Sequence, residues 1–183
     1  MNAKKYKTRA ELLNLIPQNS IICEIGVFRG EFAREIINIT NPKELWLVDI
    51  WEGKWGSGDK DGNNHTEIEN MESVYLNLYQ QTKHISNIHV VRCKSELFLL
   101  SCEDNYFDAI YIDGDHTAAA VYKDLVNAFT KIKDKGLLMG HDYHYKIGGE
   151  VVYAVNNFCK EYNQTIKYIA DDGCPSFAIE VCK

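Results

Sequence analysis

Ionisable side chains follow several of the apolar segments that we interpret as strands. Clusters of them begin at Glu24, Asp49, Ser95, Asp113 and His141. In a sheet of parallel strands joined by helices, ligands bind at the carboxyl ends of the strands. A purely structural role does not require carboxylates and imidazoles at so many strand ends. The spacing therefore predicts a binding or catalytic site at one edge of a sheet.

The first cluster is a turn with the sequence Glu24-Ile25-Gly26-Val27-Phe28-Arg29-Gly30. Two glycines between a strand and a helix let the backbone approach a ligand closely. The spacing is G-x-x-x-G, so the dinucleotide fingerprint G-x-G-x-x-G is not met. The carboxylate of Glu24 repels phosphate and suits a cationic ligand. The alternative is that the glycines only shape the turn.

The second cluster is Asp49-Ile50-Trp51, at the end of the apolar segment 44–50. An acidic residue about 20 positions after a glycine turn is placed to accept hydrogen bonds from both ribose hydroxyls. Trp51 offers a flat face for adenine or for a substrate. A solvated aspartate at a strand end is the alternative, but nucleoside binding is the interpretation we adopt.

The last two clusters combine carboxylates with imidazoles. Asp113 and Asp142 end neighbouring predicted strands, close enough to share a divalent ion with His141. Oxygen ligands favour Mg²⁺, whereas an imidazole shifts the preference towards Mn²⁺, Fe²⁺ or Zn²⁺. Asp115 or His116 is the candidate general base, because imidazole titrates near neutral pH. The alternative for this pair is capping of the helix that follows.

The elements that must position these residues alternate regularly. Predicted strands cover 20–25, 44–50, 87–92, 107–113, 137–140, 166–170 and 177–181. Predicted helices start at a capping box at Thr8 and then cover 30–39, 68–83, 95–102, 118–132 and 150–162. Five β-α repeats imply a mostly parallel sheet with helices on both faces. The last two strands are joined by a tight turn and must pair antiparallel.

Length and composition bound the remaining possibilities. The chain of 183 residues is predicted to form a single domain over 1–183, in which 1–19 is an N-terminal helical extension. The Gly- and Asn-rich segment 52–67 is an inserted loop and a candidate lid, with Trp55 and His65 as candidate substrate contacts.

The charge and the apolar pattern make further predictions. A net charge of −6 with no basic stripe argues against nucleic acid, and no apolar run is long enough to span a membrane. No secretory signal precedes the first predicted helix, and the six cysteines never form C-x-x-C pairs. We therefore expect a cytoplasmic protein with free thiols.

Together the motifs E-I-G-V-x-x-G, L-V-D-x-W, Y-I-D-G-D-H and G-x-L-x-G-H-D-Y resemble those of the class I S-adenosylmethionine-dependent methyltransferases. Within that family the chain is similar to the small group that includes sugar and macrolide O-methyltransferases. The resemblance extends over about 20–181. It implies an α/β, Rossmann-like, doubly wound sheet of about seven strands in the order 3-2-1-4-5-7-6. It also implies O-methylation of a hydroxyl on a small molecule, sugar or glycan, with Mg²⁺ or Mn²⁺ as the assisting metal. The short N-terminal extension leaves room for a homodimer.

Carried over position by position, the resemblance also assigns roles to residues. The methionine-binding turn is implied at Glu24, Gly26 and Gly30, and the ribose hydroxyls are implied to bind Asp49. The other implied contacts with S-adenosylmethionine are Ile50, Trp51, Ser95 and Asp113, and the implied metal ligands are Asp113, His141 and Asp142. The first motif departs from the common E/D-x-G-x-G-x-G form, because its middle glycine is missing.

Two other functions fit the same residues. A metal-dependent oxygenase or hydrolase on the same fold could use His116, His141 and Asp142 as two imidazoles and one carboxylate. A non-catalytic module that only binds S-adenosylmethionine would not need the second carboxylate of the Asp113-Gly114-Asp115 segment. Stoichiometric iron without methyl transfer would favour the oxygenase.

Overall fold

The structure is a computed structural model that describes residues 3–55, 69–144 and 149–183. The main strands are β1 (Lys4–Tyr6), β2 (Ile21–Ile25), β3 (Glu44–Asp49), β6 (Ile88–Arg92), β7 (Phe107–Ile112), β8 (Ile132–Gly140), β9 (Ile166–Ala170) and β10 (Ser176–Glu180). The helices are α1 (Arg9–Leu13), α2 (Glu31–Thr40), α3 (Met71–Thr82), α4 (Ser95–Ser101), α5 (Ala118–Lys131) and α6 (Glu150–Glu161). Two short strands, β4 (Lys54–Trp55) and β5 (Glu69–Asn70), form a separate antiparallel pair.

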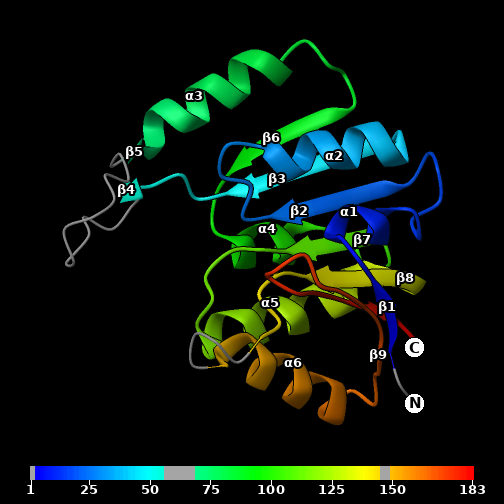
Figure 1. The fold of residues 1–183 in the computed structure, drawn as a ribbon. Coiled ribbons are helices and arrows are strands. Elements are labelled where there is room, and N and C mark those ends of the chain that lie inside the picture. Colours follow the sequence, from blue (N-terminus) through cyan, green and yellow to red (C-terminus); the bar gives the residue numbers. More distant parts are fainter. Residues whose placement is uncertain (1–2, 56–68, 145–148) are drawn as a thin grey trace.

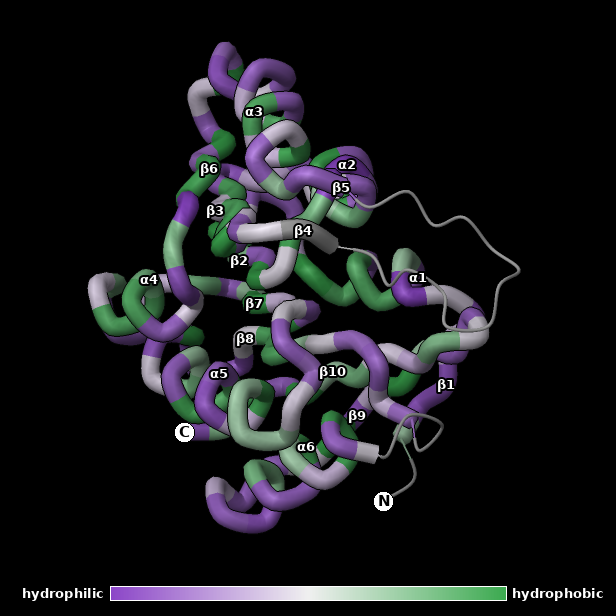
Figure 2. Tube along the Cα trace, turned by 90° about the vertical axis from the view of Figure 1, so that its left-hand side faces the viewer, coloured by the Kyte–Doolittle hydropathy of each residue, from purple (hydrophilic) through white to green (hydrophobic). Residues whose placement is uncertain are grey.

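The main sheet has the strand order β1-β9-β10-β8-β7-β2-β3-β6. The pairs among β6, β3, β2, β7 and β8 are parallel, and β10 is antiparallel to both of its neighbours. Figure 2 looks onto the carboxyl edge of the parallel strands, which follow one another from β6 to β8, with β10 and β9 beyond them. The predicted doubly wound α/β sheet is confirmed, and the seven predicted strands stand in the predicted order.

The amino-terminal segment corrects one expectation. Residues 1–19 are predicted as a helical extension, but Lys4–Tyr6 forms an eighth strand that pairs in parallel with β9. The rings of Tyr6 and Tyr168 meet at 6.1 Å across this pair. The helix α1 then ends at Leu13 and does not extend to Pro17. A three-residue strand is too short to show an alternating apolar pattern, so the sequence did not reveal it.

Helices cover both faces of the sheet, which is why its central strands are mostly apolar. All five residues of β2 are buried. Alternate side chains of this strand enter two cores, because successive side chains point to opposite faces. Cys23 packs in the core beneath α4, α5 and α6, whereas Ile22 packs in the core beneath α1, α2 and α3. Figure 1 shows α1 and α2 on one side of the sheet and α5 and α6 together on the other.

Local sequence explains where the helices begin. Thr8 caps α1 by accepting a hydrogen bond from the Glu11 N–H at 3.4 Å, as the capping box predicts. Thr117 caps α5 in the same way through the Ala120 N–H. The predicted helices at 118–132 and 150–162 are confirmed as α5 and α6.

The predicted lid lies largely outside the described residues. Of the segment 52–67, the structure describes 52–55. His65 and most of the predicted lid lie outside the described residues. Among the described residues, no helix combines the length and the apolar character needed to cross a bilayer.

Candidate active site

A cavity of about 630 Å³ opens at the carboxyl ends of β2, β3 and β7. Side chains from α1, α4 and α5 complete its walls. Of the residues predicted to bind the cofactor, those that line it are Glu24, Gly26, Asp49, Ile50, Ser95 and Asp113. Both candidate bases, Asp115 and His116, also line it. The predicted strand-end site is thus one continuous cavity.

The turn after β2 has a backbone that only glycine accommodates at one position. Gly26 has a φ of 84°, and a Cβ atom there would lie 2.0 Å from the carbonyl oxygen of Asp113. The turn therefore packs directly against the end of β7. Gly30, with a φ of 74°, is the N-cap of α2 and packs against Leu78 of α3. It positions α2 and does not line the cavity.

Asp49 organises this turn through its carboxylate. Oδ2 accepts hydrogen bonds from the N–H groups of Val27 and Phe28 at 2.9 and 3.0 Å, and Oδ1 accepts one from Trp51 at 3.0 Å. These bonds hold Phe28 in the left-handed region, with a φ of 51°. A carboxylate has about four acceptor positions, so Asp49 retains capacity for a ligand hydroxyl.

Trp51 does not occupy the place that the resemblance implies. Its side chain is fully buried, lies in the core beneath α2 and does not line the cavity. The indole N–H donates to the carbonyl oxygen of Phe28 at 2.9 Å. The ring packs 5.3 Å from that of Tyr75 on α3. The expectation that Trp51 contacts adenine is therefore corrected: its side chain packs in the core and holds the turn at Phe28 by a hydrogen bond.

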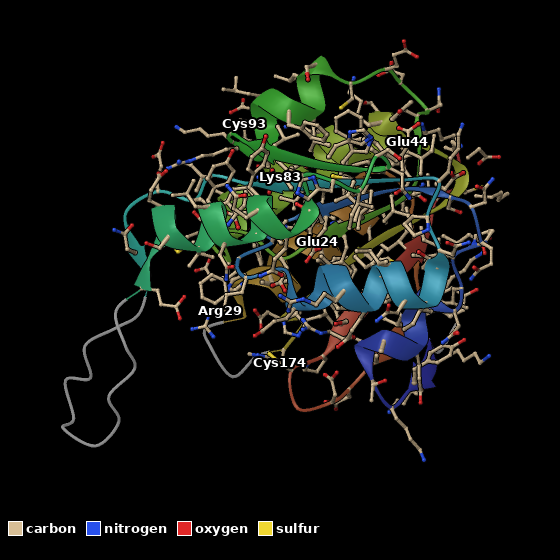
Figure 3. The ribbon with its side chains drawn as sticks, turned by 90° about the horizontal axis from the view of Figure 1, so that it is seen from above. Glu24, Arg29, Glu44, Lys83, Cys93 and Cys174 are labelled. Carbon is tan, nitrogen blue, oxygen red and sulfur yellow. The ribbon has the colours of Figure 1, made fainter. Side chains whose placement is uncertain are left out.

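Glu24 is a buried carboxylate at the floor of the cavity. Its side chain is 2% exposed, and among the described residues its Oε2 atom has no hydrogen-bond partner. Burial raises the pKa of Glu24 well above its usual range, and the charge of Asp113 adds to this rise while Arg9 opposes it. Figure 3 shows Glu24 near the middle of the molecule, between α2 and α3, with Arg29 farther out.

Arg9 is a cavity residue that sequence reasoning missed. It comes from α1, and its guanidinium lies 4.5 Å from the ring centroid of Phe32 and 3.6 Å from Asp113. A second missed residue is Asp124 of α5, which accepts a hydrogen bond from the Ser95 hydroxyl at 2.7 Å. Burial raises the pKa of Asp124. Neither residue lies in a recognisable motif, because each reaches the cavity from a neighbouring helix.

Asp113, His116, His141 and Asp142 form an ionic cluster at one end of the cavity. His116 Nε2 lies 3.1 Å from Asp142 Oδ2 and 3.4 Å from Asp113 Oδ1. His141 Nδ1 lies 3.6 Å from the same two oxygens. The structure therefore brings the predicted metal ligands Asp113, His141 and Asp142 together, and it adds His116 to them.

The charges of this cluster stabilise one another. Burial alone would lower the pKa of His141, but the carboxylates of Asp113 and Asp142 outweigh burial and raise it to about 9. The pKa of His116 rises through its hydrogen bond with Asp113. The His141 imidazole correspondingly lowers the pKa of Asp142. At neutral pH the cluster thus favours carboxylate–imidazolium pairs.

Asp115 has a structural partner. Its Oδ1 accepts a hydrogen bond from the Thr117 N–H at 2.8 Å, ahead of α5. Asp115 thus orders the turn before the Thr117 cap of α5, and this leaves His116 as the stronger candidate for a base.

The comparisons with known proteins agree with this architecture. Residues 23–143 match the family described as "Methyltransferase domain". No sequence among the curated proteins matches the chain.

Solved structures share the fold at low identity. The N-methyltransferase NodS from Bradyrhizobium japonicum WM9 is 16% identical with a TM-score of 0.64, over 96% of this chain and 95% of that one. SMU.1697c from Streptococcus mutans, a putative methyltransferase in complex with S-adenosylhomocysteine (SAH), is 14% identical with a TM-score of 0.64, over 93% and 94%. Spermidine synthase from Thermotoga maritima is 17% identical with a TM-score of 0.59, over 92% and 55%.

These matches favour a methyltransferase over the oxygenase or hydrolase that the imidazoles also suggested. The family match covers more than half of the chain and includes the Glu24, Asp49, Asp113 and Asp142 motifs. The chain therefore belongs to the methyltransferase domain family and has the fold of the class I S-adenosylmethionine-dependent methyltransferases.

Proposed function

We propose that the protein transfers a methyl group from S-adenosylmethionine to a hydroxyl of a small molecule, sugar or glycan. The observation that carries this proposal is Glu24, a buried carboxylate without a partner for Oε2 at the floor of the cavity. A buried polar atom is normally hydrogen-bonded, so an unpaired one facing a cavity indicates a ligand with donors. When bound, S-adenosylmethionine supplies an ammonium group and a methyl group on a sulfonium.

The residues of the cavity fit such a ligand. Glu24 and Asp113 provide carboxyl oxygens that can accept hydrogen bonds from an ammonium group, and Gly26 lets the turn after β2 pack directly against Asp113. Asp49 has acceptor capacity left for ribose hydroxyls, and Ile50, which is 36% exposed, offers an apolar surface for a base. The side chain of Ser95 is anchored to Asp124 and lines the wall that follows β6.

On the acceptor side, His116 is proposed as the general base. Its Nε2 faces Asp113 and Asp142, which leaves Nδ1 as the basic nitrogen of the neutral ring. A hydroxyl has a high pKa and becomes a better nucleophile when a base takes its proton. The same carboxylates raise the pKa of His116, so turnover should increase with pH while this imidazole loses its proton.

A divalent ion is a second way to activate the hydroxyl, and the convergence of Asp113, His141 and Asp142 supports it. Bound there, Mg²⁺ or Mn²⁺ would lower the pKa of a hydroxyl that coordinates it. Treatment with EDTA separates the two routes, because the metal-free route keeps its activity.

A cytoplasmic location is also proposed. All six cysteines fall among the described residues, and all are free thiols. Free thiols are typical of a reducing compartment.

Two experiments test the function. Calorimetry with S-adenosylmethionine and SAH should show binding of both, and no binding at high micromolar concentration would refute the proposal. A screen of hydroxyl acceptors with labelled methyl donor then allows a comparison of variants. His116→Asn should lower kcat by about 10²–10⁴-fold without changing donor affinity, whereas Asp115→Asn, whose amide oxygen can still accept from Thr117, should retain most activity.

A further inference from the structure

A second group of potential metal ligands lies beside Oδ1 of Asp142, the carboxylate oxygen that does not face His116. Asp142 Oδ2 faces His116, whereas its Oδ1 is contacted by Cys174 Sγ and lies 3.5 Å from His144 Nε2. Cys174 Sγ and His144 Nε2 are 3.3 Å apart. The structure brings them together.

The two segments that carry these residues are joined by their backbones. Asp142 and His144 follow β8, and Cys174 lies in the turn between β9 and β10. The Tyr143 N–H donates to the carbonyl oxygen of Pro175 at 2.8 Å, next to the cysteine. Figure 3 shows Cys174 at this turn, away from Glu24. The sulfur is therefore held beside the end of β8 by main-chain pairing.

The spacing of the donor atoms suits a tetrahedral metal. With metal–nitrogen or metal–oxygen bonds of ~2.0–2.1 Å and a metal–sulfur bond of ~2.3 Å, tetrahedral ligand atoms stand about 3.3–3.6 Å apart. The His144–Cys174 and His144–Asp142 separations of 3.3 and 3.5 Å lie in this range. The Cys174 Sγ–Asp142 Oδ1 separation of 2.5 Å is shorter, so these two atoms must move apart when both coordinate the ion. The potential ligand atoms of His141, Asp142 and Cys174 also lie within 4.8 Å of one another.

We propose that His141, Asp142, His144 and Cys174 form a Zn²⁺ site. One thiolate, two imidazoles and one carboxylate are ligands that Zn²⁺ accepts in tetrahedral sites, whereas Mg²⁺ prefers an all-oxygen shell. Binding replaces the S–H bond of Cys174 with a zinc–sulfur bond, and the proton leaves to solvent.

Cys174 differs from the other cysteines in its surroundings. Cys23, Cys93, Cys102 and Cys159 pack in or against the core beneath α4, α5 and α6. The remaining thiol, Cys182, is exposed and lies beside Lys135. Among the cysteines of the described residues, Cys174 is the one whose sulfur lies beside an imidazole nitrogen, that of His144. Its placement is therefore specific to the end of β8.

The site would act on the cavity through Asp142. Coordination of Oδ1 leaves Oδ2 directed at His116, which lines the cavity. Because His141 and Asp142 are shared, this ion and one bound by Asp113, His141 and Asp142 exclude each other. The zinc site is therefore an alternative to the Mg²⁺ or Mn²⁺ site of the proposed function. Its effect on His116 rests on that proposed function, but metal binding itself can be measured without methyl transfer.

Protein purified without chelators or a metal-affinity tag provides the test. After loading and desalting, elemental analysis should find one zinc per chain. Titration with Co²⁺ should produce a sulfur-to-cobalt charge-transfer band that excess Mg²⁺ does not remove. Cys174→Ser should abolish the band and weaken Co²⁺ binding by more than about 100-fold. Residues that only orient metal ligands already contribute roughly 10–100-fold to affinity, and a direct ligand should contribute more. His144→Gln should weaken binding and keep the band.

Matched controls are Cys182→Ser and His84→Gln, both at exposed positions, which should behave as wild type. The inference is overturned if the wild-type protein takes up no zinc or shows no thiolate band, whether or not the variants fold. It is also overturned if folded Cys174→Ser binds Co²⁺ as tightly as wild type. Zinc uptake without donor binding would contradict the proposed methyl transfer, and donor binding without zinc uptake would contradict only the zinc site.

Discussion

Replacing Glu24 by glutamine should stabilise the protein and weaken its binding of S-adenosylmethionine. The carboxylate is 2% exposed, its Oε2 is unpaired among the described residues, and Asp113 lies close enough to raise its pKa. A buried polar group without a partner costs about 1–3 kcal/mol, and a charged one costs more. Glutamine removes the charge at nearly constant volume. We expect a gain of about 1–3 kcal/mol at pH 7.5, or ~2–4 °C in Tm for each kcal/mol.

The gain should depend on pH in a defined direction. Because the folded-state pKa of Glu24 is raised above the unfolded value of about 4.3, the native protein holds this proton more tightly. The resulting stability is fully present below pH ~4.3 and is lost as the pH rises through the folded-state pKa. Glutamine does not titrate, so the difference in Tm between variant and wild type should grow from pH 5 upwards.

Thermal unfolding followed by circular dichroism between pH 5 and 8 measures this difference. Glu103→Gln, at an exposed position outside the cavity, controls for the loss of one negative charge. Calorimetry should show that Glu24→Gln loses about 1.5–3 kcal/mol of donor affinity, roughly 10–150-fold, since hydrogen bonds to charged groups contribute this much. A variant that is less stable than wild type at pH 7.5, or that binds the donor unchanged, would refute the reasoning.

Two further substitutions test the turn that shapes the cavity. Gly26→Ala should destabilise the protein by more than the roughly 1–2 kcal/mol that a left-handed backbone costs an ordinary residue, because the new methyl group would meet the Asp113 carbonyl. Gly53→Ala, at a φ of 75° in open space, should cost only the backbone strain, and equal losses in urea unfolding would contradict the clash. Arg92 does not line the cavity, but its guanidinium donates to two carbonyls of the loop after β3 at 3.3 and 2.8 Å. Arg92→Met should therefore weaken donor binding. Arg34→Met, which removes an exposed contact on α2, should leave calorimetric affinity unchanged.

Much of the fold could be predicted because the strands are buried on both faces. Segments 21–25 and 107–112 are apolar apart from one carboxylate each, and amphipathic helices separate them. Right-handed β-α-β connections leave few topologies for that alternation, and the resemblance to the class I methyltransferases supplied the order of the seven strands. The eighth strand was missed because its three residues pair with β9, a partner far along the chain.

The site was predicted to the extent that its residues end strands. Glu24, Asp49 and Asp113 all line one cavity, as parallel strand ends should. Trp51 also lies just after a strand, two residues beyond the end of β3, yet its backbone at a φ of 41° turns the indole into the core. A strand-end position fixes where a residue lies, but its backbone conformation decides which way the side chain points.

The amino-acid sequence by itself determined the parallel sheet, the glycine turn and the carboxylates at its edge, because these depend on local periodicity and on chain connectivity. Only the tertiary structure decided which side chains share a ligand. Asp142 meets His116 through one oxygen and Cys174 through the other, and Arg9 enters the cavity from α1. These contacts join segments about 25 to over 100 residues apart, and no local pattern records them because each depends on how strands and turns pack at the sheet edge.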